Sequence, residues 1–129
     1  MIDRPVLDTS ELIDFQRDHA DGRRFVSALL DKDAVTVHPV VVAEMLAGVL
    51  NRADLVRTKE FLARFKRLTV KSVDFETCIF FLAEVHLTYG TGWPDCLIAA
   101  TCMRLGLPLV TMNDKHFRAT CGPRLVRPY

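Results

Sequence analysis

The stretch Pro94 to Phe117, PDCLIAATCMRLGLPLVTMNDKHF, joins an apolar helical pattern to a strand-like segment that ends on polar residues. The φ angle of proline suits the first position of a helix, so we expect a helix over Pro94–Leu105. Gly106 ends that helix, and the apolar segment Leu107–Met112 is predicted to be a strand. A helix that leads directly into a buried strand is typical of layered α/β proteins.

Asp95 lies at the head of a helix face that is otherwise apolar. It shares this face with Ile98, Ala99 and Cys102, at offsets of three, four and seven residues. A favourable interaction with the helix dipole, typically about 0.3–1 kcal/mol, is one explanation for an acid in this place. A role in a functional site is the other, and it requires support from elsewhere in the chain.

Strand-like and helical segments alternate along the rest of the chain. We expect strands over Arg4–Asp8, Ala34–His38, Arg67–Lys71 and Leu107–Met112, with an edge strand at 124–128. We expect helices over 9–18, 22–32, 39–50, 54–65, 75–89 and 94–105, and a short one near Lys115. This alternation predicts one α/β domain over residues 1–129 with a mostly parallel central sheet.

The composition excludes several classes of protein. The chain of 129 residues is half hydrophobic and carries a formal net charge of +1, which excludes disorder. It contains no apolar run long enough to span a membrane and no export signal, so we expect a cytoplasmic protein. The four cysteines form no C-x-x-C pair and the four histidines have no zinc-site spacing, so we expect buried, reduced thiols. Glycine-rich phosphate-binding loops are also missing from the sequence.

Four polar positions stand out, and three of them fall at the end of a predicted strand or at the start of a predicted helix. Asp8 ends the first strand, Glu44 lies within VVVAEMLAGVL, Asp95 begins a helix, and Asn113 and Asp114 follow the strand at 107–112. Parallel strands place such residues at one edge of the sheet, where two carboxylates 5 Å apart repel by about 3 kcal/mol. A hard divalent cation with oxygen ligands would relieve that repulsion and is suited to phosphodiester cleavage. Separately, Asp8 could be a simple helix cap and Glu44 could face solvent or pair with an arginine.

Three segments of the chain resemble the PIN-domain ribonucleases, in particular the VapC-type toxins of bacterial toxin–antitoxin pairs. These segments are VLDTSELIDF (6–15), VVVAEMLAGV (40–49) and PDCLIAATCMRLGLPLVTMNDKHF (94–117). The resemblance implies a three-layer PIN-like fold and a Mg²⁺-dependent endoribonuclease in which Mn²⁺ substitutes for Mg²⁺. It implies that Asp8 and Asp95 hold the metal.

The resemblance also implies roles for the remaining polar positions. Glu44 assists through a metal-bound water or as the base, and Asn113 occupies the fourth polar position, which is a departure from an all-acid set. Asp114 is an alternative source of the missing charge through water. Ser10 is expected to hold a water through its hydroxyl group.

A basic segment offers a surface for RNA. Residues 51–71 contain seven basic and two acidic residues, a local charge of +5, and Arg64, Lys66 and Arg67 are the predicted substrate contacts. A solvated helix face is the alternative interpretation. For Trp93, next to the predicted site, we expect packing between helices.

The expected partners follow from the resemblance. It implies an RNA substrate, a cognate VapB-like antitoxin and a homodimer, with the apolar helix after Pro39 as a possible interface. The alternatives are a non-catalytic PIN-like RNA- or protein-binding module, a flavodoxin-like receiver and another metal-dependent phosphohydrolase. A receiver would need paired acids after the first strand, and LDTSE (7–11) does not provide them.

Overall fold

The fold is built on a five-stranded parallel sheet with strand order β3-β2-β1-β4-β5. The computed structural model describes residues 5–17, 19–31, 35–112, 115, 117, 120 and 125–128. The strands are β1 (Val6–Leu7), β2 (Thr36–Val37), β3 (Lys66–Arg67), β4 (Leu109–Val110) and β5 (Leu125–Val126). The central strands β1 and β4 are completely buried, as expected for a parallel sheet that is covered on both faces.

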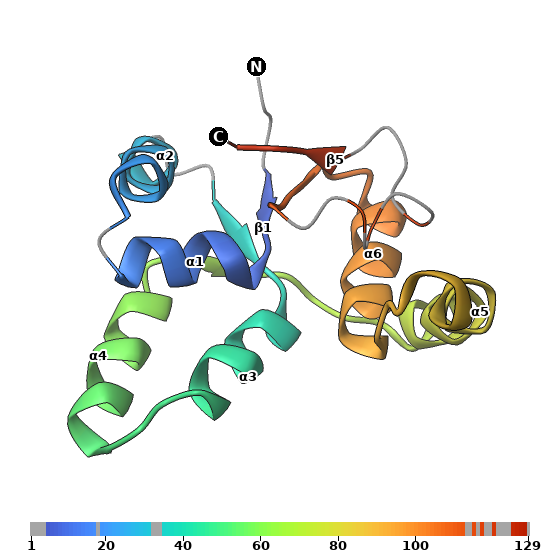
Figure 1. Cartoon of the computed structure of the whole chain (residues 1–129), viewed down its shortest axis with the longest axis horizontal. Helices are drawn as coiled ribbons and strands as arrows, with labels where there is room; N and C mark the ends of the chain where they lie inside the picture. The colour runs from blue at the N-terminus through green and yellow to red at the C-terminus, as the bar shows by residue number, and fades with distance from the viewer. Residues whose placement is uncertain are drawn as a thin grey trace.

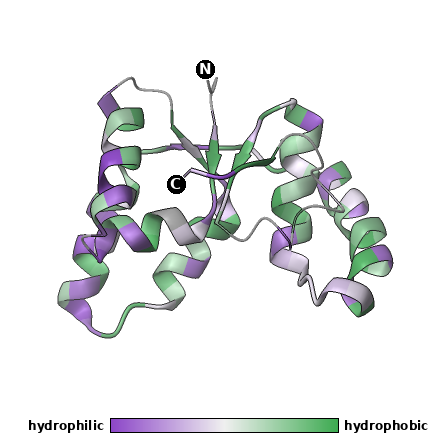
Figure 2. Cartoon of the chain, turned by 45° about the horizontal axis from the view of Figure 1, so that its top comes forward, coloured by the Kyte–Doolittle hydropathy of each residue, from purple (hydrophilic) through white to green (hydrophobic). Residues whose placement is uncertain are grey.

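Helices cover both faces of this sheet. They are α1 (Thr9–Gln16), α2 (Ala20–Asp31), α3 (Pro39–Ala47), α4 (Arg52–Leu62), α5 (Ser72–Tyr89) and α6 (Trp93–Leu105). In Figure 1, α5 and α6 pack together on one side of the strands, and α1, α2 and α4 lie on the other. Hydrophobic residues gather on the central strands (Figure 2). The predicted α/β class and the flanked parallel sheet are confirmed.

Local sequence signals determine where several helices begin and end. Asn51 caps α4, since its side chain accepts a hydrogen bond from the Asp54 N–H at 2.8 Å. Gly90 and Gly106 adopt φ angles of 69° and 67° at the ends of α5 and α6, which glycine reaches without strain. The helix end predicted at Gly106 is therefore confirmed.

The core contains the predicted reduced cysteines. Cys78, Cys96 and Cys102 are buried free thiols, and burial, with smaller contributions from Cys78 and Asp95, raises the pKa of Cys96 to about 11. At neutral pH this side chain is an inert apolar group. Cys121 lies outside the described residues.

A buried polar network connects α3, α5 and α6. The His38 ring is completely buried, and its Nδ1 accepts a hydrogen bond from the Val40 N–H at 3.0 Å, so the proton of the neutral ring lies on Nε2. That Nε2–H donates to the Thr101 hydroxyl at 2.9 Å, and the hydroxyl donates to Asp74 Oδ2 at 3.1 Å. Arg104 donates to both oxygens of Asp74, at 2.7 and 3.0 Å. The network joins α3, which carries Glu44, to α6, which carries Asp95.

The prediction for the third strand was wrong in its position. The strand comprises Lys66–Arg67 rather than Arg67–Lys71. The backbone beyond it is used elsewhere: the Thr69 carbonyl accepts from Arg104 at 2.8 Å, and the Lys71 N–H donates to Asp74 at 3.0 Å. These bonds to α5 and α6 take the chain away from the sheet. Several helix bounds also differ by two or three residues from the predicted ones.

A membrane-spanning helix does not occur in the described ranges, because none of the helices there is both long and apolar enough.

Candidate functional site

Asp8 joins the ends of two neighbouring parallel strands. It follows β1, is 5% exposed and caps α1 by accepting a hydrogen bond from the Thr9 N–H at 2.8 Å. Its second carboxylate oxygen accepts from the hydroxyl of Thr111, the residue that follows β4, at 2.9 Å. The buried carboxylate is thus oriented from both strands at the carboxyl edge of the sheet, where ligands bind in open α/β folds.

Glu44 lies next to Asp8 through a shared threonine. The Thr9 hydroxyl donates to Glu44 Oε1 at 3.0 Å. Partial burial raises the pKa of Glu44, the hydrogen bond from Thr9 lowers it, and the negative charge of Asp8 raises it further. A carboxyl group with a raised pKa accepts a proton more readily at neutral pH, which suits a general base.

Glu44 is not enclosed by apolar side chains as its sequence neighbours suggested. The residue is exposed, while Val41, Val42 and Met45 of the same helix enter the core. Glu44 forms part of the wall of a pocket of about 240 Å³ between α1, α3 and α4. Among the residues that the structure describes, it pairs with no arginine, so that alternative is not supported.

Asp95 occupies the first turn of α6, as predicted, and is partly buried. Since α6 leads back to the beginning of β4, its first turn lies toward the edge where the parallel strands end. Its charge contributes to the raised pKa of Cys96. Within the described ranges, however, no three His, Cys, Asp or Glu side chains form a group that could hold a metal.

The other predicted positions divide into two classes. Ser10 follows Thr9 in the first turn of α1 and is half-buried. Asn113 and Asp114 lie outside the described residues. The described part of the site therefore consists of the Asp8–Glu44 pair with Thr9 and Thr111, and of Asp95 at the start of α6.

The types of donor at these positions suit a hard divalent cation, although the described side chains form no complete ligand group. All of the potential donors are carboxylate or hydroxyl oxygens, the type of ligand that Mg²⁺ and Mn²⁺ prefer. Burial is the main cause that raises the pKa of Glu44, and repulsion from the charge of Asp8 is a smaller one, which a cation would neutralise.

Two threonines of this site were not singled out from the sequence. Thr9 orients Glu44 and Thr111 orients Asp8. Only their positions, directly after Asp8 and directly after β4, could have indicated a role in the site. Threonine is common in such turns, so these positions are a weak indication.

The predicted basic contacts do not form one surface. The Arg64 guanidinium lies 5.9 Å from the centre of the Phe15 ring, on the α1 side. Lys66 and Arg67 are exposed on the edge strand β3, and neighbouring strand residues point to opposite faces. Trp93, for which we expected packing between helices, is 54% exposed.

Comparison with known proteins shows where this fold belongs. The model of the PIN domain family matches residues 6–123. A toxin–antitoxin complex from Klebsiella pneumoniae contains a chain with 24% identity and a TM-score of 0.79, over 97% of this chain and 98% of that one. A DNA-bound VapBC from Salmonella typhimurium has 20% identity and a TM-score of 0.74, over 98% of both chains. VapBC-1 from nontypeable Haemophilus influenzae has 18% identity and a TM-score of 0.73, over 98% of this chain and 97% of that one.

These similarities to solved structures concern the fold. No curated protein shows significant sequence similarity to the chain. The match to the family model extends from β1 to beyond β4 and includes Asp8, Glu44 and Asp95. The chain belongs to the PIN domain family.

Proposed function

We propose that the protein is a Mg²⁺-dependent endoribonuclease, the VapC-type toxin of a toxin–antitoxin pair. The observation that carries this proposal is the buried Asp8 carboxylate beside Glu44, bridged by Thr9 at the carboxyl edge of a PIN-domain sheet. The toxin–antitoxin complexes among the similar structures support the toxin role.

Each acid has a distinct role in the proposed mechanism. Asp8 and Asp95 would hold the metal ion, Glu44 and Asp114 would reach it through water, and Asn113 would complete the set of polar residues. A bound divalent cation supplies electrostatic stabilisation for the charge that develops on the phosphate. Glu44 accepts the proton of the attacking water, because its pKa is raised toward neutrality and Thr9 orients it. Thr111 keeps Asp8 in place, and Ser10 positions a water through its hydroxyl group.

Metal dependence tests this function directly. Purified protein incubated with total cellular RNA should produce discrete fragments in Mg²⁺ or Mn²⁺ and none in a chelator. Restoration of cleavage by either metal after chelation is the control. Cleavage that persists in the chelator would exclude the metal mechanism, whereas RNA binding without cleavage would favour a non-catalytic binding module.

An antitoxin is the proposed protein partner. The pocket between α1, α3 and α4 combines two acids, Glu44 and Asp54, and one base, Arg17, with apolar Ile13, Met45 and Val49. Such a surface suits a segment that carries both apolar side chains and a cation such as arginine, which would neutralise Glu44. The RNA substrate of a bacterial toxin is cytoplasmic, so the proposal requires a cytoplasmic location.

We propose a homodimer, with an interface on α5 rather than on α3. The apolar residues of α3 mostly enter the core, whereas Phe75, Ile79, Phe80 and Leu87 of α5 are 49%, 62%, 63% and 96% exposed. Phe75 and Ile79 are four residues apart, and Phe80 and Leu87 are seven apart, so the residues form two neighbouring pairs on the exposed part of the helix. Large apolar side chains exposed together on one helix are typical of a protein interface.

Charge placed on the α5 face should separate the dimer. We expect Ile79→Lys combined with Phe80→Glu to halve the mass measured by light scattering, because burying these charges costs several kcal/mol. Leu50→Lys is the matched control, since Leu50 is 90% exposed after the end of α3 and outside the α5 face. A double variant with the mass of the wild-type protein would assign the interface to another surface.

A further inference from the structure

A second pocket lies between β2, β3 and the end of α6. Its volume is about 570 Å³, and its walls include Val35 and Thr36 at the beginning of β2, and Leu105 and Leu107 before β4. Asp8 and Thr111 follow the ends of β1 and β4. A volume of this size is in the range of small-molecule sites, roughly 300–1,000 Å³.

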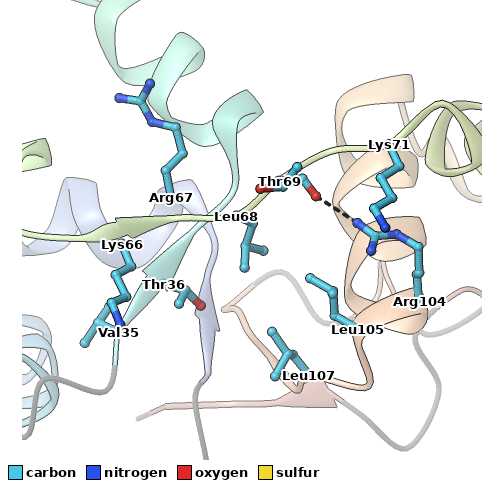
Figure 3. A pocket seen from close by; sticks show the side chains of 10 residues that line it. All are labelled: Val35, Thr36, Lys66, Arg67, Leu68, Thr69, Lys71, Arg104, Leu105 and Leu107. Atoms are coloured by element: carbon cyan, nitrogen blue, oxygen red, sulfur yellow. Dashed lines mark hydrogen bonds between the residues drawn. The ribbon is translucent and has the colours of Figure 1, made fainter.

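Basic side chains surround this pocket. Lys66, Arg67, Lys71 and Arg104 all contribute to its walls. In Figure 3, Lys66 and Arg67 leave the strand in opposite directions, and Lys71 and Arg104 are at the other end of the view. Lys66, Arg67 and Lys71 form no ion pair within the part of the chain that the structure describes.

Arg104 is the fixed cation of the group. Asp74, only 1% exposed, accepts two hydrogen bonds from it, and its Nη2 also donates to the Thr69 carbonyl at 2.8 Å. The charge of Arg104 is balanced by Asp74, whereas Lys71 forms no ion pair with any acid that the structure describes. The pocket therefore retains an excess of positive charge that an anion would neutralise.

Part of the pocket is apolar. Leu68, Leu105 and Leu107 line the side between β3 and the end of α6 (Figure 3). A small inorganic anion would leave this apolar surface uncovered, and a purely apolar ligand would leave the lysines without a counter-charge. The lining suits a ligand that joins a phosphate to a flat, weakly polar group.

We propose that this pocket binds a phosphorylated nucleoside, with its phosphate on Lys71 and its base on the leucine surface; in an RNA strand, Lys66 contacts a neighbouring phosphate. The nucleoside is either a free nucleotide or one residue of an RNA strand. The RNA form rests on the proposed nuclease function, and the free-nucleotide form does not. Arg104 and Asp95 are nine residues apart on α6, about 14 Å along its axis, so the pocket is a site separate from the acids.

Binding measurements on the full chain test this inference. The pocket variant Lys66→Gln with Lys71→Gln is compared with Arg23→Gln with Arg24→Gln, which removes the same charge from exposed positions on α2. The probes are adenosine 5′-monophosphate, inorganic phosphate and a single-stranded RNA decamer, all titrated in chelator so that RNA is not cleaved. We expect the pocket variant to bind the probes about tenfold more weakly. The slope of log K for RNA against log salt concentration should become shallower by about 1.4, at roughly 0.7 per lost phosphate contact.

Each outcome has a definite meaning. Loss of mononucleotide binding in the pocket variant alone supports a free-nucleotide site, and loss of RNA binding alone supports a strand site. The inference is overturned if both pairs of substitutions have equal effects, if no probe binds, or if inorganic phosphate binds as tightly as the mononucleotide. Cleavage of RNA by the wild-type protein is measured separately. If the protein binds the mononucleotide but does not cleave RNA, the nuclease proposal is contradicted and the pocket proposal stands. If it cleaves RNA but does not bind the mononucleotide or RNA at the pocket, only the pocket proposal is contradicted.

Discussion

Replacing Asp95 by asparagine is expected to lower the rate of RNA cleavage by more than about 100-fold, since losing even an indirect metal contact costs 10–100-fold. Asparagine keeps the size of the side chain but removes the charge that would hold the cation. The fold should survive, because the loss of a first-turn charge costs only about 0.3–1 kcal/mol. The measurement is the cleavage rate in saturating Mg²⁺, with thermal unfolding of the same preparation.

A matched variant tests whether the loss of a first-turn acid outside the site also lowers the rate of cleavage. Asp21→Asn removes an acid from the first turn of α2, where the exposed Asp21 pairs with Arg24 on the helix surface. We expect it to cleave RNA at the wild-type rate and to unfold at nearly the wild-type temperature. A wild-type rate in Asp95→Asn itself would remove Asp95 from the site.

Acid is expected to destabilise the protein through His38. Complete burial of the ring lowers the pKa of His38 to about 4, although the negative charge of Asp74 raises it slightly. In the unfolded chain the ring has its usual pKa near 6.5, so as pH falls below 6.5 the unfolded state binds a proton that the folded state does not. The free energy of unfolding should fall by about 3 kcal/mol between pH 6.5 and pH 4.

Urea titrations at several pH values measure this loss. His38→Asn keeps a side chain that can cap α3 but does not titrate, so its stability should depend much less on pH in this range. Its absolute stability will be lower, and the comparison concerns the slope alone. His86→Gln, which replaces an exposed histidine, should retain the wild-type slope. Equal slopes for His38→Asn and the wild-type protein would refute the assignment to His38.

Asp74 changes stability in a different range of pH. Hydrogen bonds from Arg104 are the largest cause that lowers the pKa of Asp74, so its contribution to stability is lost only below its usual pKa of 3.8. The decline expected between pH 6.5 and pH 4 therefore belongs to the histidine end of the network and not to the Asp74–Arg104 pair.

The sequence alone determined the α/β class, the place of Asp8 after a buried strand and the place of Asp95 at a helix start. These features depend on hydrophobic periodicity, on the fixed φ of Pro94 and on the turn at Gly106, which act within a few residues. The position of Asp8 at a strand end and of Asp95 at a helix start could thus be predicted from neighbouring residues, and the proposed roles of both acids depend on these positions.

Only the tertiary structure decided which surfaces are buried and which side chains meet. Thr9 reaches Glu44, 35 residues away, and Thr111 reaches Asp8, 103 residues away, through strand order that no local pattern encodes. Apolar residues of α5 remain exposed, whereas those of α3 enter the core. The difference arises because the tertiary fold decides which surface each helix packs against. Lys66, Lys71 and Arg104 line one pocket for the same reason: the sheet and α6 bring together residues that are distant in the chain.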